Sequence, residues 1–354
     1  MCPRLVEDDE GLKWLVEERR YPMPLKNEFV AGRGAEWYGM GEQMLRKEDL
    51  LPEYYDSAMR AAALRSDGLI GSVCFPTLPK FAGTMFLQTH DKTLADLCIK
   101  AYNDFVFEEW CAGDPSFYVP MIISQLWDPI AAAKEVRRNA ERGSRAVSLP
   151  ENTVQLGLPS YHTDHWDPLW QAIQETQQTV CMHVATSSAL PRPSPEATFT
   201  VTIILVQNNA AECFINLAFS PVLRKFPEIQ FVLSEGGIGW IPALLERADR
   251  MWEIHKAWDT LEMARTPSEI FADNFYCCWV GERTGVLMRE AIGVDRITFE
   301  TDYPHAETPF PHSQKMIEET MAGVPADEVA MMTYRNAARA FRWEVPEVAE
   351  GASA

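Results

Sequence analysis

The stretch "RITFETDYPH", residues 296–305, ends on two side chains that could carry chemistry, Asp302 and His305. An alternating apolar run leads directly into the acid, an aromatic residue, a proline and the histidine. Carboxylates and imidazoles bind divalent metals, and they are also the groups that most often move protons in enzymes. The stretch therefore predicts a metal-binding or proton-transferring group at the end of a strand.

Two further ionisable residues stand in comparable positions. His183 lies late in the apolar run 178–186, and Glu235 ends the run 229–237 just before a Gly-Gly pair. Taken singly, His183 could be a hydrogen-bonded core residue, Glu235 a helix cap and Asp302 part of an Asx turn. Ionised groups buried together need a partner or a metal, so the set favours a functional site.

The surrounding sequence predicts a parallel sheet that would hold these groups along one edge. Mostly apolar, strand-like runs alternate with helical stretches, as in parallel strands buried on both faces. One helix should begin after Asp128, with Pro129 in its first turn, and a second should begin in the same way at Asp167. The expected strands are 68–77, 117–127, 144–150, 178–186, 229–237, 274–280 and 296–304. In such folds, ligands bind at the carboxyl ends of the strands.

The composition of the chain argues against nucleic acid and membranes as partners. The chain has 354 residues, of which 47% are hydrophobic, and its net charge is −19 without any basic run. This charge would repel nucleic acid and anionic membranes, and no apolar stretch of bilayer length stands out. The eight cysteines form no CxxC pair, and Cys277 and Cys278 should face opposite sides of a strand. We expect a cytoplasmic protein with reduced thiols.

The pattern predicts three parts of the chain. Residues 1–60 should form a small exposed hairpin followed by loop and short helix, residues 61–342 a (β/α) barrel, and residues 343–354 a frayed tail. A closed barrel needs eight strands, and the chain supplies seven. Among weaker candidates, Arg283 could bind an anionic substrate, and the sequence "HTDH" at 162–165 could lie near the site.

Four segments resemble the amidohydrolase-related metal-dependent enzymes, a family that includes aminocarboxymuconate-semialdehyde decarboxylase and the hydroxybenzoate-type decarboxylases. They cover residues 101–135, 149–188, 226–253 and 297–311. The resemblance implies a distorted (β/α)8 TIM barrel with one divalent metal, usually zinc with manganese as an option, and no organic cofactor. It also implies that His183 and Asp302 are metal ligands and that the protein is a homodimer.

The sequence departs from the family pattern in two places. The family opens with a strand that bears an HxH or DxH pair of metal ligands, and this chain has no such strand. We therefore expect the chain to start after the point where the family's first strand would lie. Glu235 stands where the decarboxylases carry a catalytic histidine. A carboxylate can act as a base, but its proton affinity differs from that of imidazole.

These observations predict a metal-dependent enzyme that decarboxylates a small organic acid, including aromatic acids, with Glu235 or His305 moving the proton. Hydrolysis of an amide, ester or lactone by a metal hydroxide is the alternative within enzymes. A truncated or inactive barrel that serves as a partner subunit is the alternative outside them. A barrel that lacks one strand exposes two sheet edges, which invites pairing with another chain.

Overall fold

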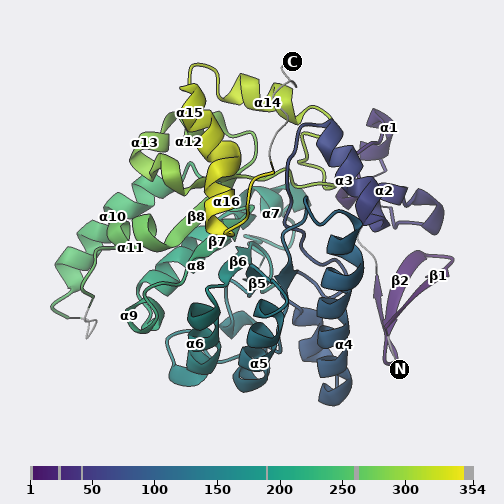
Figure 1. The fold of residues 1–354 in the computed structure, drawn as a ribbon, viewed down its shortest axis with the longest axis horizontal. Helices are drawn as coiled ribbons and strands as arrows, with labels where there is room; N and C mark the ends of the chain where they lie inside the picture. Colours follow the sequence, from purple (N-terminus) through teal and green to yellow (C-terminus); the bar gives the residue numbers. More distant parts are fainter. Residues whose placement is uncertain (1–2, 23–24, 41–42, 189, 259–262, 347–354) are drawn as a thin grey trace.

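The fold is built around a six-stranded parallel sheet with helices in its crossovers (Figure 1). The computed structural model describes residues 3–22, 25–40, 43–188, 190–258 and 263–346. Each strand pairs in parallel with the next one along the chain. The strands are β4 Met121–Ile122, β5 Ala146–Ser148, β6 Thr179–His183, β7 Phe231–Ser234, β8 Phe275–Trp279 and β9 Ile297–Phe299. Six of the seven predicted strands are thus confirmed, although most are shorter than expected.

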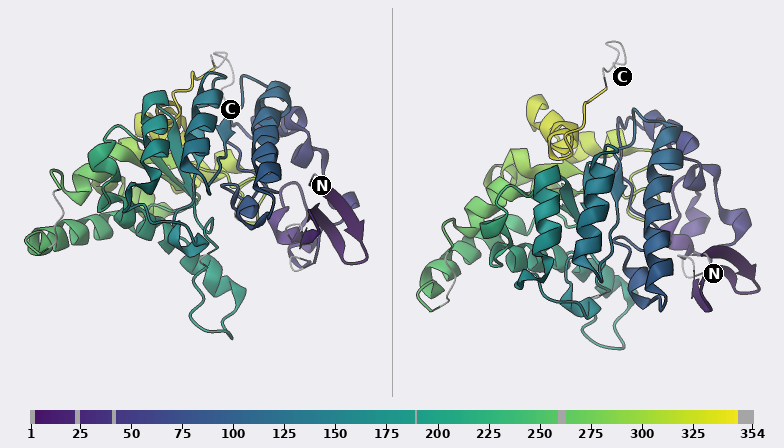
Figure 2. Two further views of the ribbon diagram at one scale, coloured as in Figure 1. Left: turned by 90° about the horizontal axis from the view of Figure 1, so that it is seen from below. Right: turned by 60° about the horizontal axis from the view of Figure 1, so that its bottom comes forward.

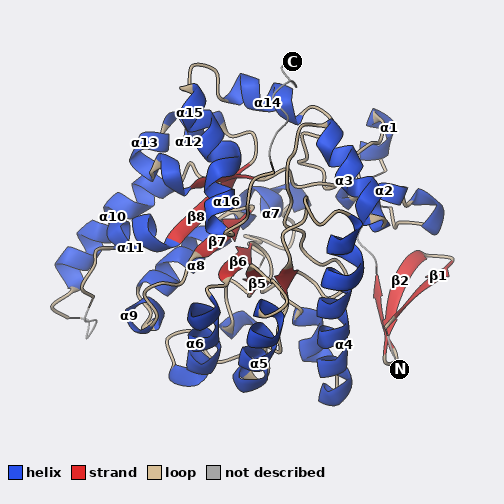
Figure 3. Cartoon of the chain, in the orientation of Figure 1, coloured by secondary structure: helices blue, strands red, loops and turns tan. Residues whose placement is uncertain are grey.

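Helices occupy every crossover of this sheet, as Figure 3 shows in blue against the red strands. The interior is dominated by large buried side chains that pack between helices and strands, including Trp166, Trp170 and Phe214. The crossover helices are α5 Pro129–Ala140, α6 Asp167–Thr176, α7 Phe199–Val206, α8 Asn208–Ala218, α9 Val222–Lys225, α10 Ile241–His255, α11 Pro267–Asn274, α12 Arg283–Leu287 and α13 Arg289–Ile292. The α/β barrel architecture predicted from the sequence is therefore confirmed.

The barrel does not close. The seventh predicted strand, 68–77, is joined to the sheet only by a parallel bridge between Ser72 and Tyr118. In the part of the chain that the structure describes, β9 has no strand partner on its outer edge. The C-terminal helices α14 Ser313–Thr320, α15 Ala326–Ala330 and α16 Asn336–Ala340 follow β9, and α16 packs against it. The ring of Trp343 packs so closely on Gly71 that a Cβ atom there would lie 2.6 Å from it.

The two Asp-Pro helix starts behave differently. The Asp128 side chain accepts hydrogen bonds from the backbone N–H groups of Ile130 and Ala131, as expected of an N-cap. Asp167 is instead the first residue of α6, and its carboxylate pairs with Lys225 at 2.8 Å. The expectation of a second Asp N-cap was wrong, because a short 3₁₀ turn over Asp164–Trp166 leads directly into that helix.

The N-terminal region forms a separate antiparallel sheet of β1 Arg4–Asp8, β2 Gly11–Val16 and β3 Arg19–Pro22. The predicted hairpin is present as β1 and β2, but it is not exposed throughout, because Leu12 and Val16 of β2 are buried. The helices that follow are α1 Ala35–Tyr38, α2 Pro52–Tyr55, α3 Ser57–Ser66 and α4 Lys92–Phe105. Phe29 and Tyr54 share a hydrophobic cluster with Tyr303, which brings this region to the mouth of the barrel.

Six of the described cysteines are free thiols, namely Cys74, Cys111, Cys181, Cys213, Cys277 and Cys278. Cys277 and Cys278 face opposite sides of β8 as predicted. Cys2 lies outside the described residues.

One helical stretch, Phe199–Ala218, passes a length and composition test for a membrane span, contrary to the expectation from the sequence. Its second half has an ordinary explanation, because Phe214 and Leu217 of α8 are buried in the core. Its first half, α7, exposes Phe199 and Ile204. Figure 2 shows the teal segment that contains α7 projecting from the body of the molecule.

Candidate active site

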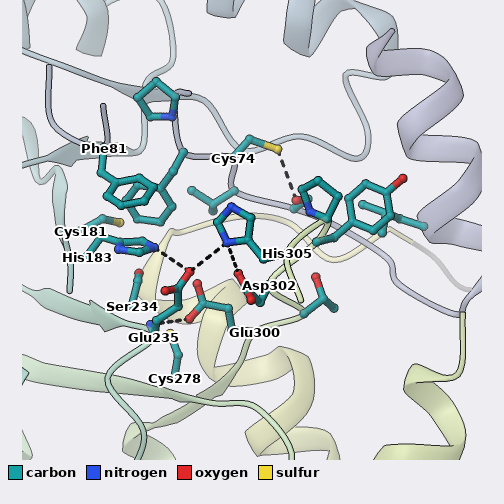
Figure 4. A pocket seen from close by; sticks show the side chains of 18 of the residues that line it. Cys74, Phe81, Cys181, His183, Ser234, Glu235, Cys278, Glu300, Asp302 and His305 are labelled. Carbon is teal, nitrogen blue, oxygen red and sulfur yellow. Dashed lines mark hydrogen bonds and ion pairs between the residues drawn. The ribbon is translucent and has the colours of Figure 1, made fainter. Parts of the chain in front are cut away.

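The carboxyl ends of β6, β7 and β9 open into one cavity of about 1050 Å³. Its lining includes the four residues that the sequence singled out, His183, Glu235, Asp302 and His305. Figure 4 shows these side chains converging, with His183 and His305 on either side of the Glu235 carboxylate. All four residues therefore follow the rule that functional groups at the carboxyl ends of parallel strands share one site.

His183 is the last residue of β6 and is almost completely buried. Its Nδ1 donates to the Val184 carbonyl oxygen at 2.7 Å, and its Nε2 donates to Glu235 Oε1 at 2.7 Å. Phe81 stacks on the imidazole at a centroid distance of 3.8 Å, and Phe75 meets it edge-on. These contacts leave the ring little freedom to rotate.

Glu235 follows β7 directly and has a left-handed backbone with φ of 54°. Its carboxylate lies 2.7 Å from His183 Nε2 and 3.9 Å from His305 Nδ1. Burial alone would raise the pKa of Glu235, but the charge and hydrogen bond of His183 lower it to about 2. Burial would likewise lower the pKa of His183, and Glu235 raises it to about 9. The pair is therefore ionised at neutral pH.

Asp302 and His305 form the second half of the group. Asp302 Oδ1 lies 2.8 Å from His305 Nδ1, and the His305 backbone N–H donates to the Asp302 carbonyl oxygen. Burial, followed by the nearby Glu235 charge, raises the pKa of Asp302 to about 7. Burial would lower the pKa of His305, but the hydrogen bond with Asp302 raises it to about 9. His305 is the more exposed of the two histidines, with 33% of its side chain accessible.

The ligand atoms of Glu235, Asp302 and His305 lie within 4.8 Å of one another, a spacing that a single metal ion could bridge. Carboxylate oxygen and imidazole nitrogen suit divalent cations such as zinc and manganese. His183 is outside this trio but adjoins it through Glu235. The residues present therefore fit a divalent cation.

Several residues that the sequence analysis missed also line the cavity, among them Glu28, Arg60 and Glu300. Glu28 and Arg60 come from the N-terminal 3₁₀ turn and α3, which carry no strand-end signal. Burial raises the pKa of Glu28, and the His305 charge opposes that shift. Glu300 could have been found, because it stands two residues before Asp302 in the same short stretch of sequence.

Arg60 is a half-buried cation at the cavity wall. Its Nη2 donates to the Tyr303 carbonyl oxygen at 2.6 Å, and its guanidinium lies 4.7 Å from the centre of the Tyr303 ring. Its Nε is buried and has no hydrogen-bond partner among the described residues. Arg60 thus places a positive charge against Tyr303, which lies between Asp302 and His305 in the sequence.

The weaker candidates lie elsewhere. Arg283 donates to the Thr320 carbonyl oxygen at the end of α14, so it is a structural cap and not an anion-binding group of this cavity. His162 contacts Asn216, and Asp164 pairs with Lys225 on the outer surface.

The family model described as Amidohydrolase matches residues 56–343. Two gamma-resorcylate decarboxylases are each 26% identical to the chain: one from Polaromonas sp. (strain JS666 / ATCC BAA-500) over 229 residues, and one from Rhodococcus jostii (strain RHA1) over 224. These alignments cover 60% and 57% of this chain and 68% and 64% of the two enzymes.

Solved structures show the same fold. An amidohydrolase from Mycobacterium avium subsp. paratuberculosis K-10 superposes with a TM-score of 0.73 at 18% identity, covering 96% of this chain and 90% of that one. A dihydroxybenzoic acid decarboxylase from Polaromonas sp. JS666, with bound manganese and the inhibitor 2-nitroresorcinol, superposes with a TM-score of 0.61 at 20% identity, covering 87% and 89%.

The His183–Glu235 pair predicts a pH-dependent stability of the metal-free protein. The pKa of His183 is raised from 6.5 to about 9 by folding, so its contribution is complete below pH 6.5 and is lost as pH rises to about 9. We expect the difference in free energy of unfolding between the wild type and Glu235→Gln to shrink over this range, by up to about 3 kcal/mol. Urea denaturation at half-unit pH steps would measure it, and a difference that stays constant from pH 6.5 to 9 would contradict the pairing.

Proposed function

Because the chain belongs to the amidohydrolase family, we propose that it is a metal-dependent decarboxylase of a small aromatic carboxylic acid. The observation that carries the proposal is the convergence of Glu235, Asp302 and His305, with His183 adjoining, in one cavity at the strand ends. The decarboxylase activity of the matched relatives supports the choice of reaction.

A divalent cation, zinc or manganese, would be held by Asp302 and Glu235 of the trio, with the adjoining His183 as the third ligand in place of His305. His183 has the arrangement usual for a metal-binding histidine, since its Nδ1–H donates to a backbone carbonyl and so leaves Nε2 as the ligand atom. Nε2 must lose its proton for this, so binding should release protons and strengthen as pH rises. When bound, the cation would supply positive charge that polarises substrate oxygen atoms.

Arg60 and the cavity walls would orient the substrate. A guanidinium recognises a carboxylate well because its N–H groups match the two oxygens. Arg60 lines the cavity, so its guanidinium is placed to make such a contact. Phe75 and Phe81 provide apolar surface for a ring near His183. The cavity is at the upper end of the volumes usual for small-molecule sites, so it admits a substituted ring.

His305 is the better proton donor of the two residues considered. With a pKa near 2, Glu235 carries no proton at neutral pH, whereas His305 is protonated and accessible from the cavity. His305 would donate its proton to the ring carbon that bears the carboxylate. The bond between that carbon and the carboxylate then breaks, its electron pair restores the aromatic ring, and carbon dioxide leaves. Water afterwards returns a proton to His305.

The first test is turnover of a panel of hydroxybenzoic acids by the purified chain supplied with manganese or zinc. We expect release of carbon dioxide with an equal amount of the phenol. We expect His305→Gln to lower kcat by about 100-fold or more while metal content is kept, because general acid catalysis contributes about that much. Asp302→Asn should instead reduce metal content as measured by elemental analysis.

Three outcomes would contradict the proposal. Release of acid from esters or lactones without carbon dioxide would identify a hydrolase. Full activity of both variants would remove these residues from the mechanism. Inactivity towards every acid and ester, with no metal retained, would favour a non-catalytic partner subunit.

We also propose that a second copy of the chain covers α7. Phe199 and Ile204 are 59% and 69% exposed, and residues 197–211 carry no charged side chain. In a chain with a net charge of −19, an uncharged apolar face is where two copies can approach with least repulsion.

Light scattering after size-exclusion chromatography would test this pairing. We expect a dimer for the wild type and a monomer for Ile204→Glu, because the new carboxylates would meet across an apolar interface. Leu287→Glu is the matched control, since Leu287 is an aliphatic residue that is likewise exposed, at 59%, but lies on α12. A monomeric wild type, or a dimeric Ile204→Glu, would contradict the assignment.

A further inference from the structure

Glu300 is an ionisable residue of the cavity to which the proposed reaction gives no role. It directly follows β9 and lines the cavity, as Thr298 and Asp302 do. In Figure 4 its side chain points toward Glu235 and not toward the two histidines. Its Oε2 accepts a hydrogen bond from the Glu235 backbone N–H at 2.8 Å.

This hydrogen bond falls on an unusual stretch of backbone. Glu235 has φ of 54°, a left-handed conformation that is uncommon for a residue with a side chain. Such residues persist at functional sites when their surroundings hold them in place. Because Glu235 has left the sheet, its N–H has no neighbouring strand to bond to, and the Glu300 carboxylate takes that place.

The direction of the Glu235 side chain depends on this conformation. At this φ the side chain leaves the strand end toward His183 Nε2 at 2.7 Å and His305 Nδ1 at 3.9 Å. In the ordinary extended conformation, the Cα–Cβ bond would point elsewhere relative to β7, and both contacts would be lost. The link between β9 and Glu235 therefore sets the distance between a carboxylate and two imidazoles.

We propose that Glu300 is a positioning residue, which holds the Glu235 carboxylate between His183 and His305 by accepting the Glu235 backbone N–H. Its effect on catalysis rests on the proposed function, whereas its effect on Glu235 does not. What matters is an acceptor oxygen at this position, so an amide should replace the carboxylate and an apolar side chain should not.

Two substitutions distinguish the effect of the acceptor oxygen from the effect of side-chain volume. Glu300→Gln keeps an acceptor oxygen, and Glu300→Leu fills a similar volume without one. Asp67→Leu is the matched control, because the Asp67 carboxylate is also buried and also accepts a backbone N–H, that of Ser313, outside the site. All three should lower stability to some degree, so stability alone does not test the proposal.

The decisive readouts are spectroscopic. The proton shared by His183 Nε2 and Glu235 should give a low-field, exchange-protected proton NMR signal in the metal-free protein. We expect the wild type, Glu300→Gln and Asp67→Leu to keep this signal and Glu300→Leu to lose it. Manganese affinity, measured by electron paramagnetic resonance, should fall by about 10- to 100-fold in Glu300→Leu, as is usual when a group that orients a ligand is removed. It should change by less than about threefold in the other two variants.

Two results would overturn the proposal. One is a Glu300→Leu protein that keeps both the low-field NMR signal and its manganese affinity. The other is a Glu300→Gln protein whose signal and manganese affinity fall as much as those of Glu300→Leu. Should Glu300→Leu not fold, Glu300→Ala removes the same acceptor and carries the same test. If the variants behave as expected but no acid is decarboxylated, the positioning role stands and the proposed reaction falls. If the acids are decarboxylated while Glu300→Leu matches the wild type, only the positioning role falls.

Discussion

The half-buried Glu235 carboxylate lies at the end of β7 with a histidine on either side, His183 at 2.7 Å and His305 at 3.9 Å. A charge largely removed from water is costly unless partners neutralise it. Here both neighbours carry raised pKa values and supply positive charge, while Asp302 balances His305. The four groups thus form a nearly neutral set, and the surrounding structure serves to keep them together. Removing one member would leave an unpaired charge in the cavity.

The fold provides that support from several strands at once. β6 ends on His183, β7 leads into Glu235, and β9 leads through Glu300 into Asp302. Hydrogen bonds then cross between strand ends, from Glu235 to Glu300 and from His183 to Glu235. The N-terminal region closes the group from outside, since the backbone N–H groups of Val30 and Ala31 donate to the Pro304 carbonyl oxygen. The site is therefore built from three strand ends and an N-terminal segment far from them in sequence.

Much of this could be predicted from the sequence, for identifiable reasons. Apolar runs separated by helices predict parallel strands, and the carboxyl-end rule then brings His183, Glu235, Asp302 and His305 together without any contact information. Arg60 and Glu28 could not be predicted in this way, because their approach to the cavity depends on how an irregular N-terminal segment packs on Tyr303. Arg283 was misplaced because a position after a strand does not fix the direction of a side chain. It turns toward the end of α14.

The central claim is that the group at the strand ends is a cation site whose ligands are His183, Asp302 and Glu235. The most direct test is a crystal of the full chain grown with manganese, with diffraction data collected at the manganese absorption edge. The account predicts one anomalous peak per chain, within about 2.3 Å of His183 Nε2 and of carboxylate oxygens of Asp302 and Glu235. A cavity without an anomalous peak, with Nε2 of His183 still bonded to Glu235, would contradict it.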